Sequence, residues 1–293
     1  MSIYRLFNLK VKADINLTDE ILPESVKPDY KIYESSISPI NKNYIWYHRV
    51  YDKKRIWLSF SKHRNNFGIR FHRYADFKIN SQSNEIFYYK RENTSLNTLR
   101  HLINDQVIPL TLTLSNKTVF HSSTVKIGDY AVSFQAPSGS GKSTIAAYFV
   151  SKNHELITDD SLLLGNKNKN IYAYPSYPCF RLWPESLNNL FKNKIKCENV
   201  SQFNSKKLIS SDMNVIPTSK KPLKLKSIYF LNYFDSTGIV SISQTDSFSN
   251  LIKNLYRLDL NNKKTNSIHF EFINKVLKNV ELYKLNYEKK YKS

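Results

Sequence analysis

Alternating apolar and polar residues run through much of the first third of the chain. The alternation is partial but repeated, with strand-like segments at residues 4–11, 55–60, 68–74 and 85–89. Side chains on one face of a β-strand recur at every second residue, so this pattern predicts strands. We therefore expect residues 1–94 to form a β-rich N-terminal domain. No catalytic grouping of residues is visible there, and the domain is expected to support the rest of the chain or to present a surface to a partner.

The pattern changes after residue 94, and we expect residues 95–293 to form a second domain. Apolar residues three and four positions apart predict helices here, and short apolar runs between them predict buried strands. A turn at residues 127–129 favours a hairpin between two of these strands. The expected elements are a helix at 95–105, strands at 118–125 and 130–135, a helix at 144–150 and a strand at 155–160. This mixture of elements places the chain in the α/β (α+β) class.

Three expectations concern the last 120 residues. The proline-rich, aromatic segment 174–185 favours an ordered loop, because proline is excluded from central strands and helix interiors, with a helix from Pro184 to about residue 192. Two apolar runs, 228–234 and 239–243, predict a hairpin. Two amphipathic helices follow, the second carrying apolar residues as far as Tyr283.

A glycine-rich loop stands out between the strand at 130–135 and the helix that follows it. The chain has only 6 glycines, where average usage would give roughly 20. Two of them, Gly139 and Gly141, fall in the octet APSGSGKS at residues 136–143. A strand, a glycine loop, a Lys-Ser pair and a helix in this order form the phosphate-binding P-loop, with Ala136 in the first position. The alternative is a Ser/Gly surface turn that happens to precede a helix.

The residue types in the octet suit phosphate binding. A Cβ at either glycine would obstruct the turn or the approach of phosphate oxygens. Successive backbone N–H groups at a helix N-terminus form an anion-binding nest. Lys142 would bridge the β- and γ-phosphates, and the Ser143 hydroxyl would be a ligand of Mg²⁺.

An acidic pair, Asp159 and Asp160, ends the short strand at 155–160. Open α/β sheets bind ligands at the carboxyl ends of their strands. Because adjacent strand residues point to opposite faces, we expect the two carboxylates to have different roles. One would bind Mg²⁺ together with Ser143, and the other would accept the proton of an acceptor hydroxyl. The alternative is a pair of solvated aspartates that close a turn.

Charge and composition limit the partners and the cellular location that we expect for this protein. The formal net charge is +20, which attracts polyanions such as nucleotides, acidic peptides, nucleic acids or anionic membranes, although a basic surface can also be merely solvated. The chain shows no helix-turn-helix, RNA-recognition or zinc motif, so nucleic acid is an unfavoured partner. Cys179 and Cys197 are the only cysteines, no signal-peptide pattern is visible, and no apolar stretch reaches transmembrane length. We expect a cytoplasmic protein with no membrane partner.

The run Phe120-His121-Ser122-Ser123, the P-loop and the acidic pair together resemble the C-terminal catalytic domain of HPr serine kinase/phosphorylase, over roughly residues 110–185. Residues 4–9 and 174–184 are similar to the HPr-kinase-like enzymes of ribosomal-peptide gene clusters, including lasso-peptide precursor kinases. Two departures argue against HPr itself as the substrate. The P-loop serine is followed by Thr144 rather than glutamate, and the glycine-rich motif expected after the acidic pair is missing.

The resemblance implies a P-loop core that transfers phosphate from ATP, or another nucleoside triphosphate, to a serine of a precursor peptide. It implies that Ser143 and Asp160 bind Mg²⁺ and that Asp159 is the general base. His121 would lie near the transferred phosphate, or else be an ordinary surface histidine; Arg181 would bind phosphate or acceptor, or else form a structural ion pair. The phosphates would be held by Ser138, Gly139, Ser140, Gly141, Lys142, Ser143 and Thr144.

Two other functions remain open from the sequence. A kinase of the same fold would act on a small molecule, and a non-enzymatic nucleotide-binding protein would use the loop as a regulatory switch. The peptide, the modified serine and the oligomeric state are not specified by the sequence, and a homo-oligomer is among the options.

Overall fold

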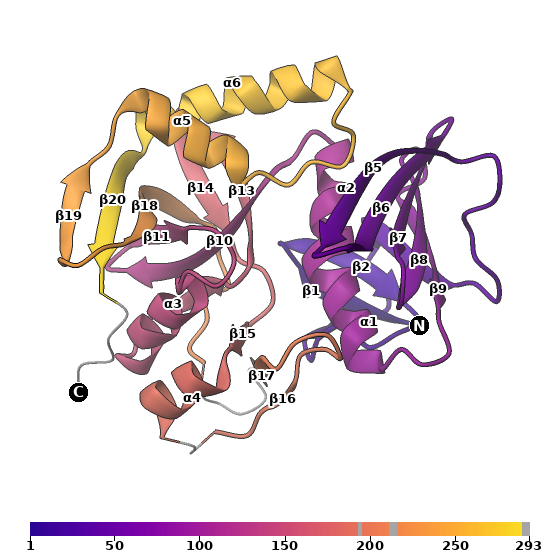
Figure 1. Cartoon of the computed structure of the whole chain (residues 1–293), viewed down its shortest axis with the longest axis horizontal. Helices are drawn as coiled ribbons and strands as arrows, with labels where there is room; N and C mark the ends of the chain where they lie inside the picture. The colour runs from indigo at the N-terminus through magenta and orange to yellow at the C-terminus, as the bar shows by residue number, and fades with distance from the viewer. Residues whose placement is uncertain (193–194, 211–215, 289–293) are drawn as a thin grey trace. The chain divides into compact units, whose positions relative to one another are not determined.

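The computed structural model describes residues 1–192, 195–210 and 216–288, and it is a strand-rich mixed α/β structure (Figure 1). The chain forms two compact units. The first contains Met1–Ser115 and Val200–Asn204, and the second contains Asn116–Asn199 and Ser205–Ser293. The sequence analysis assigned the helical segment after residue 94 to the second domain, whereas its contacts place it in the first unit. Within the described residues, no helix is both long and apolar enough to cross a membrane.

The first unit is built on a nine-stranded sheet with the order β3-β1-β2-β4-β9-β8-β7-β6-β5. Its strands follow the segments in which apolar and polar residues alternate, because alternation buries one face of each strand. The strands are β1 (Ser2–Leu6), β2 (Leu9–Ala13), β3 (Ile21–Leu22), β4 (Tyr30–Glu34), β5 (Ile45–Asp52), β6 (Arg55–His63), β7 (Asn66–Phe71), β8 (Ala75–Asn80) and β9 (Glu85–Lys90).

A continuous helical segment completes the first unit. It comprises α1 (Leu96–Leu102), a π-helical turn η1 (Ile103–Val107) and α2 (Ile108–Leu114). Ser95 caps its start by accepting a hydrogen bond from the backbone N–H of Thr98 at 3.2 Å. The N-cap hydroxyl satisfies one of the amides that the first helical turn leaves without a partner, which is why the helix begins there.

The second unit contains a larger sheet with the order β11-β10-β13-β14-β18-β20-β19, in which β12 also pairs with β10 and β11 with β18. The predicted hairpin of β10 and β11 is present, with Ser122 opposite Gln135 and Ile127 opposite Tyr130. Strands β11, β18 and β20 run parallel to one another. The strands are β10 (Thr118–Ile127), β11 (Tyr130–Gln135), β12 (Leu156–Thr158), β13 (Ser161–Lys167), β14 (Asn170–Tyr174), β18 (Leu223–Tyr233), β19 (Gly238–Ser241) and β20 (Glu281–Tyr287).

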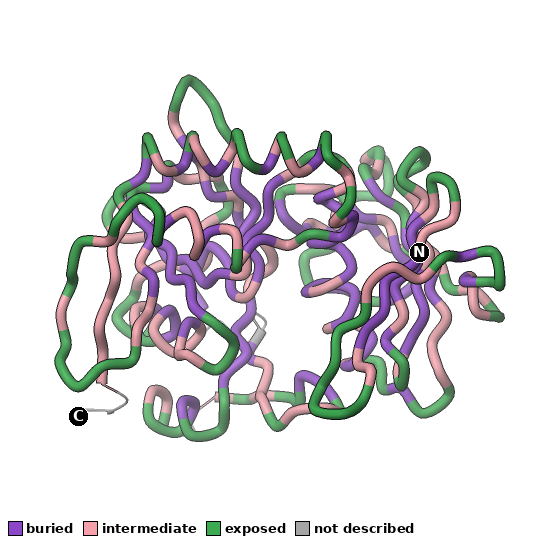
Figure 2. Tube along the Cα trace, turned by 45° about the horizontal axis from the view of Figure 1, so that its top comes forward, coloured by how far each residue is buried: buried purple, intermediate pink, exposed green. Residues whose placement is uncertain are grey.

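Helices cover both faces of this sheet, and most residues of β10, β11, β12 and β13 are buried (Figure 2). One hydrophobic cluster joins Phe120 and Ile228 to α5 (Gln244–Lys253) and α6 (Lys263–Asn279) through residues such as Leu251 and Ile273. A second cluster joins Phe134 to α3 (Lys142–Ser151) and α4 (Pro184–Phe191) through residues such as Ala146 and Leu187. The helix expected from Pro184 is therefore confirmed.

Three sequence predictions in this unit are wrong. The expected hairpin of β18 and β19 does not form, because β20 lies between them and pairs with both. The last helix ends at Asn279, and Tyr283 belongs to β20, whose Leu282 and Leu285 pack on the two different hydrophobic clusters. The proline-rich segment is not wholly a loop. It contains β15 (Cys179–Leu182), which pairs with β17 (Lys207–Ser210), and β17 pairs in turn with β16 (Glu198–Asn199).

Candidate functional site

The glycine-rich loop joins the carboxyl end of β11 to the first residue of α3, as predicted. Gly139 and Gly141 both have φ of +82°, a conformation that side chains with a Cβ rarely adopt. Gly141 is the N-cap of α3, and the backbone N–H of Ser140 donates to the Pro137 carbonyl at 3.3 Å. The two glycines therefore allow the turn that leads the loop into the helix N-terminus.

Lys142 lies inside this loop and is only 5% exposed. Its ammonium group donates to the carbonyl oxygens of Ala136 at 2.8 Å and Pro137 at 3.2 Å. Burial lowers the pKa of Lys142, while the nearby carboxylates of Asp160 and Asp159 act in the opposite direction. The lysine, the loop and the acidic pair therefore belong to one electrostatically coupled site.

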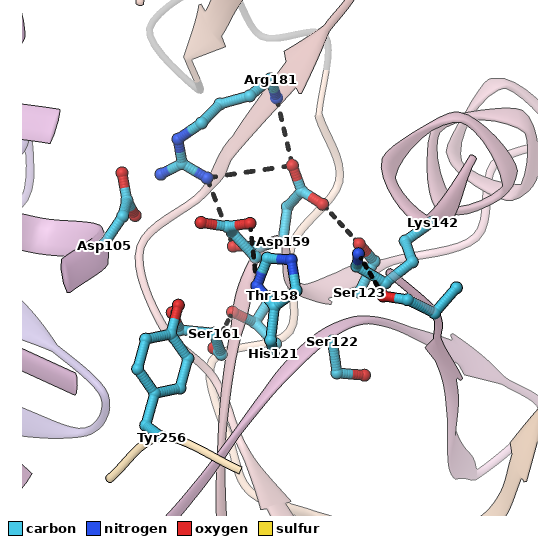
Figure 3. A network of polar contacts seen from close by, with 12 residues as sticks. Asp105, His121, Ser122, Ser123, Lys142, Thr158, Asp159, Ser161, Arg181 and Tyr256 are labelled. Atoms are coloured by element: carbon cyan, nitrogen blue, oxygen red, sulfur yellow. Dashed lines mark hydrogen bonds and ion pairs between the residues drawn. The ribbon is translucent and has the colours of Figure 1, made fainter. Parts of the chain in front are cut away.

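Asp159 is held by partners from two other elements (Figure 3). Its Oδ1 accepts a hydrogen bond from the Ser123 hydroxyl of β10 at 2.5 Å. Its Oδ2 accepts from the backbone N–H of Arg181 in β15 at 3.1 Å, and the Arg181 guanidinium lies 3.9 Å from the same oxygen. All three residues are buried. The carboxylate therefore has a fixed orientation.

Asp160 occupies a turn rather than a strand. Strand β12 ends at Thr158, and Asp160 has φ of +79°, which Asp and Asn tolerate better than most residues. The Thr158 hydroxyl donates to the Ser161 carbonyl at 2.7 Å, which helps to close the turn. We expected the two carboxylates to point to opposite faces of a strand, and this is wrong because both residues lie beyond the end of β12. Both carboxylates are close enough to Lys142 to raise its pKa.

His121 lies beside Asp160, with Nδ1 3.2 Å from Oδ1. Burial lowers the pKa of His121, and Asp160 opposes this shift. The histidine is fixed from the other side as well, since its backbone N–H donates to the Asn254 carbonyl at 2.7 Å and its ring lies 6.3 Å from that of Tyr256. His121 is thus a member of the acidic cluster and not an isolated surface histidine.

Arg181 takes part in an ion pair with Asp159 and also donates to the hydroxyl of Tyr177. Its guanidinium further donates to the Asp159 carbonyl at 3.4 Å. In this structure Arg181 orients the carboxylate, which corresponds to the ion-pair alternative that the sequence left open. Phosphate or acceptor binding by Arg181 stays a prediction.

Several residues of the site have no role assigned from sequence. Ser123 stands in the quoted His-Ser-Ser run, but only the fold places its hydroxyl on Asp159. Ser186 of α4 shares a hydrogen bond with Thr144 at 3.0 Å, which joins α4 to the first turn of α3.

The hydroxyl of Tyr287 in β20 donates to the Ser140 carbonyl at 2.8 Å. The sequence predicted a helix as far as Tyr283 and no strand after it, so the approach of Tyr287 to the loop was not foreseen.

The donor set at the loop fits Mg²⁺. This ion prefers oxygen ligands and is usually held by one or two carboxylates together with substrate phosphates and water. Ser143 opens α3 directly after the loop lysine, and Asp160 is coupled electrostatically to that lysine. The hydroxyl of Ser143 and the carboxylate of Asp160 are the groups that would hold the ion.

Comparisons with known proteins give little further guidance. No protein-family model matches the chain, and no curated protein matches it. Among solved structures, the Hpr(Ser) kinase/phosphatase from Coxiella burnetii aligns with 58% of this chain and 85% of its own length, at 9% identity and a TM-score of 0.28. This partial likeness is too low to establish a shared fold, so function has to be inferred from the residues of the site.

Proposed function

We propose that this protein is a Mg²⁺-dependent kinase that transfers the γ-phosphate of ATP, or another nucleoside triphosphate, to a serine hydroxyl of a peptide. The observation that carries this proposal is the buried Lys142 in a glycine-rich loop at a helix N-terminus, with the carboxylates of Asp159 and Asp160 close enough to favour its charged form. Phosphoryl transfer requires a phosphate cradle, a metal ligand and a group that orients or deprotonates the acceptor, and these residues would supply all three.

Phosphate binding would be the task of the loop and the first turn of α3. Residues 138–144 provide backbone N–H groups at a helix N-terminus, where the helix dipole also favours anions. The carbonyl oxygens of Ala136 and Pro137 now accept the hydrogen bonds of the Lys142 ammonium. Phosphate oxygens would compete for the same donor with the advantage of negative charge.

The metal would be held by Ser143 and Asp160, with phosphate oxygens and water completing its coordination. When bound, Mg²⁺ neutralises charge on the phosphates and orients them. The carboxylate Oδ1 of Asp160 lies 3.2 Å from Nδ1 of His121, so it would have a defined position before the metal arrives. His121 would thereby support the geometry of the metal ligand.

Asp159 would hold the proton that leaves the acceptor. The acceptor oxygen would form a bond to the γ-phosphorus while the bond from that phosphorus to the β–γ bridging oxygen breaks, and the nucleoside diphosphate would be released. Ser123 shows where a hydroxyl binds this carboxylate, because its Oγ donates to Oδ1 at 2.5 Å. An acceptor serine that displaces or joins Ser123 at Oδ1 would deliver its proton to Asp159.

The choice of a peptide as acceptor rests on sequence and charge. The resemblance of residues 4–9 and 174–184 to precursor-peptide kinases favours a ribosomal peptide. The net charge of +20 favours an acidic one, and Lys206 adds positive charge close enough to the loop to affect the pKa of Lys142. A small-molecule kinase would need neither feature.

The experiment is to incubate the purified protein with ATP, Mg²⁺ and precursor peptides encoded beside its gene, and to measure the peptide mass. The Asp159→Asn variant serves as the inactive control. Asp129→Asn is the matched control, because Asp129 is an exposed turn residue outside the site. A gain of one phosphate with the wild type and Asp129→Asn, but not with Asp159→Asn, is the expected result.

Other outcomes distinguish the alternatives. Binding of ATP without phosphorylation of any peptide would favour a small-molecule acceptor or a regulatory nucleotide switch. Loss of ATP binding in Asp159→Asn would show that the roles assigned to the two aspartates are wrong. Absence of nucleotide binding by the wild type would contradict the proposal as a whole.

A further inference from the structure

Two tyrosines lie together at the carboxyl ends of neighbouring parallel strands. Tyr233 ends β18 and Tyr287 ends β20, and the two are directly opposite each other in the sheet register. Their ring centroids are 6.2 Å apart with an interplanar angle of 71°. Tyr233 is 60% exposed, so much of its large aromatic side chain is accessible at the end of β18. The exposed aromatic ring of Tyr233, with Tyr287 packed edge to face against it, therefore lies at this end of the two strands.

The tyrosine pair borders the phosphate loop. The Tyr287 hydroxyl donates to the Ser140 carbonyl at 2.8 Å, and a Cβ placed on Gly141 would lie 3.8 Å from the same hydroxyl. Strand β18 also pairs directly with β11, the strand that leads into the loop. The carboxyl ends of β11, β18 and β20 thus form one continuous edge, which is where sheets of this kind bind ligands.

The order of the strands fixes the order in which the acidic pair, the loop and the tyrosines lie along this edge. Strand β12, with the acidic pair after it, pairs with β10; β10 pairs with β11; and β18 and β20 follow on the other side of β11. The loop therefore lies between the carboxylates and the tyrosines. A nucleotide whose γ-phosphate points to Asp159 and Asp160 has its α-phosphate and nucleoside on the side of β18 and β20.

We propose that Tyr233 and Tyr287 form the platform on which the base of the bound nucleotide stacks. The proposal rests on the proposed function, since it presumes that the loop binds the phosphates. Bases stack on aromatic rings with little dependence on their identity, because every base has a π face. Tyr233 provides the exposed ring, and Tyr287 fixes the platform to the loop through its hydroxyl.

Trp183 is the competing platform. It is the N-cap of α4, is 42% exposed, and comes near the loop because Ser186 contacts Thr144. However, the Lys206 ammonium lies over its ring at 5.5 Å, and Lys206 also acts on Lys142. A cation therefore lies over this ring, and Trp183 is less exposed than Tyr233, at 42% against 60%. We assign the base to the tyrosines.

The experiment compares two ligands that share their phosphates. Dissociation constants of Mg²⁺–tripolyphosphate and Mg²⁺–ATP are measured by titration calorimetry for the wild type, Tyr233→Ala, Tyr233→Phe and Trp183→Ala. We expect Tyr233→Ala to weaken ATP about tenfold and to leave tripolyphosphate unchanged, the size of one base-stacking contact. Tyr233→Phe keeps the ring and should keep ATP affinity. Thermal denaturation of each variant verifies that it is folded.

The contrary outcomes are separable. An unchanged ATP affinity in Tyr233→Ala, or an equal loss for ATP and tripolyphosphate, would overturn the stacking platform while leaving phosphate binding by the loop intact. A selective loss of ATP affinity in Trp183→Ala, with none in Tyr233→Ala, would move the base to α4. If the wild type bound neither ligand, the proposed function would fail, and the platform with it.

Discussion

The Ser123 hydroxyl donates a hydrogen bond to Oδ1 of Asp159 at 2.5 Å, in a position where both residues are buried. Ser123 comes from β10, Asp159 follows β12, and the neighbouring Arg181 comes from β15. Three separate elements therefore orient one carboxylate near the glycine-rich loop. A carboxylate held in this way is pre-organised, which is what a proton acceptor in phosphoryl transfer requires.

Ser123→Ala tests this arrangement. The substitution leaves a buried carboxylate oxygen with one donor fewer, and we expect a loss of about 1–3 kcal/mol in the free energy of unfolding. Because the carboxylate would also be less well oriented, kcat should fall while ATP affinity stays the same. Denaturant unfolding and steady-state kinetics measure the two effects. An unchanged kcat would mean that Ser123 has only a structural role.

Lys142→Met tests the loop lysine. The variant keeps an unbranched side chain but removes the cation that now donates to Ala136 and Pro137. Removal of a group that stabilises developing charge typically lowers kcat by roughly 100-fold or more, and we expect at least that loss. The fold should survive, because a buried ammonium is replaced by an apolar group.

Lys152→Met is the matched control for the lysine. Lys152 follows the same helix at its other end and is exposed. Its substitution should leave the transfer rate unchanged. Equal losses of activity in the two variants would indicate a general effect on α3, and retained activity in Lys142→Met would contradict the assignment of the loop.

The positive charge beside the site gives a prediction about the acceptor. Lys207 is the first residue of β17, and Lys206 directly precedes it. The charge of Lys206 is close enough to lower the pKa of Lys142. If the acceptor is an acidic peptide, Lys206→Gln with Lys207→Gln should raise its KM several-fold at low salt, and less so at high salt, because ions screen exposed charges beyond about 10 Å at 0.1 M. KM values at two salt concentrations provide the measurement.

The control for this variant is the pair Lys263→Gln and Lys264→Gln at the exposed start of α6. It removes the same charge from another part of the second unit, so it reports on net charge alone. A peptide KM that does not respond to the loss of Lys206 and Lys207 at either salt concentration would rule out electrostatic recognition there.

The local features of the site were accessible from sequence. The strand before the loop, the two glycines and the helix after it follow from short-range rules, since a strand period and a glycine turn are encoded within a few residues. Short-range rules also predict the β10–β11 hairpin, because its turn at Gly128 joins strands that are adjacent in the sequence. These predictions depend on no contact that is distant in the sequence.

The failures involve contacts between distant segments. Strand β20 enters between β18 and β19, and a parallel neighbour about 50 residues away leaves no local signal. Its residues 281–287 directly follow a strong helical pattern, so apolar Leu282 and Tyr283 extended that pattern in the sequence. The contacts of Asp159 with Ser123 and Arg181 were missed for the same reason, because three elements have to assemble before they exist.

His269 predicts a dependence of stability on pH. The residue is 2% exposed, Nδ1 lies 3.2 Å from the Thr118 hydroxyl, and burial lowers its pKa. Because the unfolded chain binds a proton more readily than the folded one, its contribution to stability is present above the unfolded pKa of about 6.5 and is lost as the pH falls below it. His269→Gln should therefore flatten the decline of Tm from about pH 7 to about pH 5.

Glutamine does not bind a proton in this pH range, so a difference in pH dependence between the wild type and His269→Gln reports on protonation of His269. His48 of β5, which is only partly buried, gives the control variant His48→Gln. That variant should keep the pH dependence of the wild type. Identical Tm profiles for the wild type and His269→Gln would show that protonation of this residue does not contribute to acid sensitivity.

Asp160 provides a carboxylate that would bind Mg²⁺ and also adopts a positive φ. Two substitutions separate these two contributions. Its φ of +79° is tolerated by Asn but strained for Ala, at a cost of about 1–2 kcal/mol. Both Asp160→Asn and Asp160→Ala remove the carboxylate that pairs with His121 and would bind Mg²⁺, so both should raise the Mg²⁺ concentration needed for half-maximal transfer. Only Asp160→Ala should also lower the free energy of unfolding by the strain. A similar Mg²⁺ requirement in the wild type and both variants would exclude Asp160 as the metal ligand, and equal stability of the two variants would show that the turn relaxes without strain.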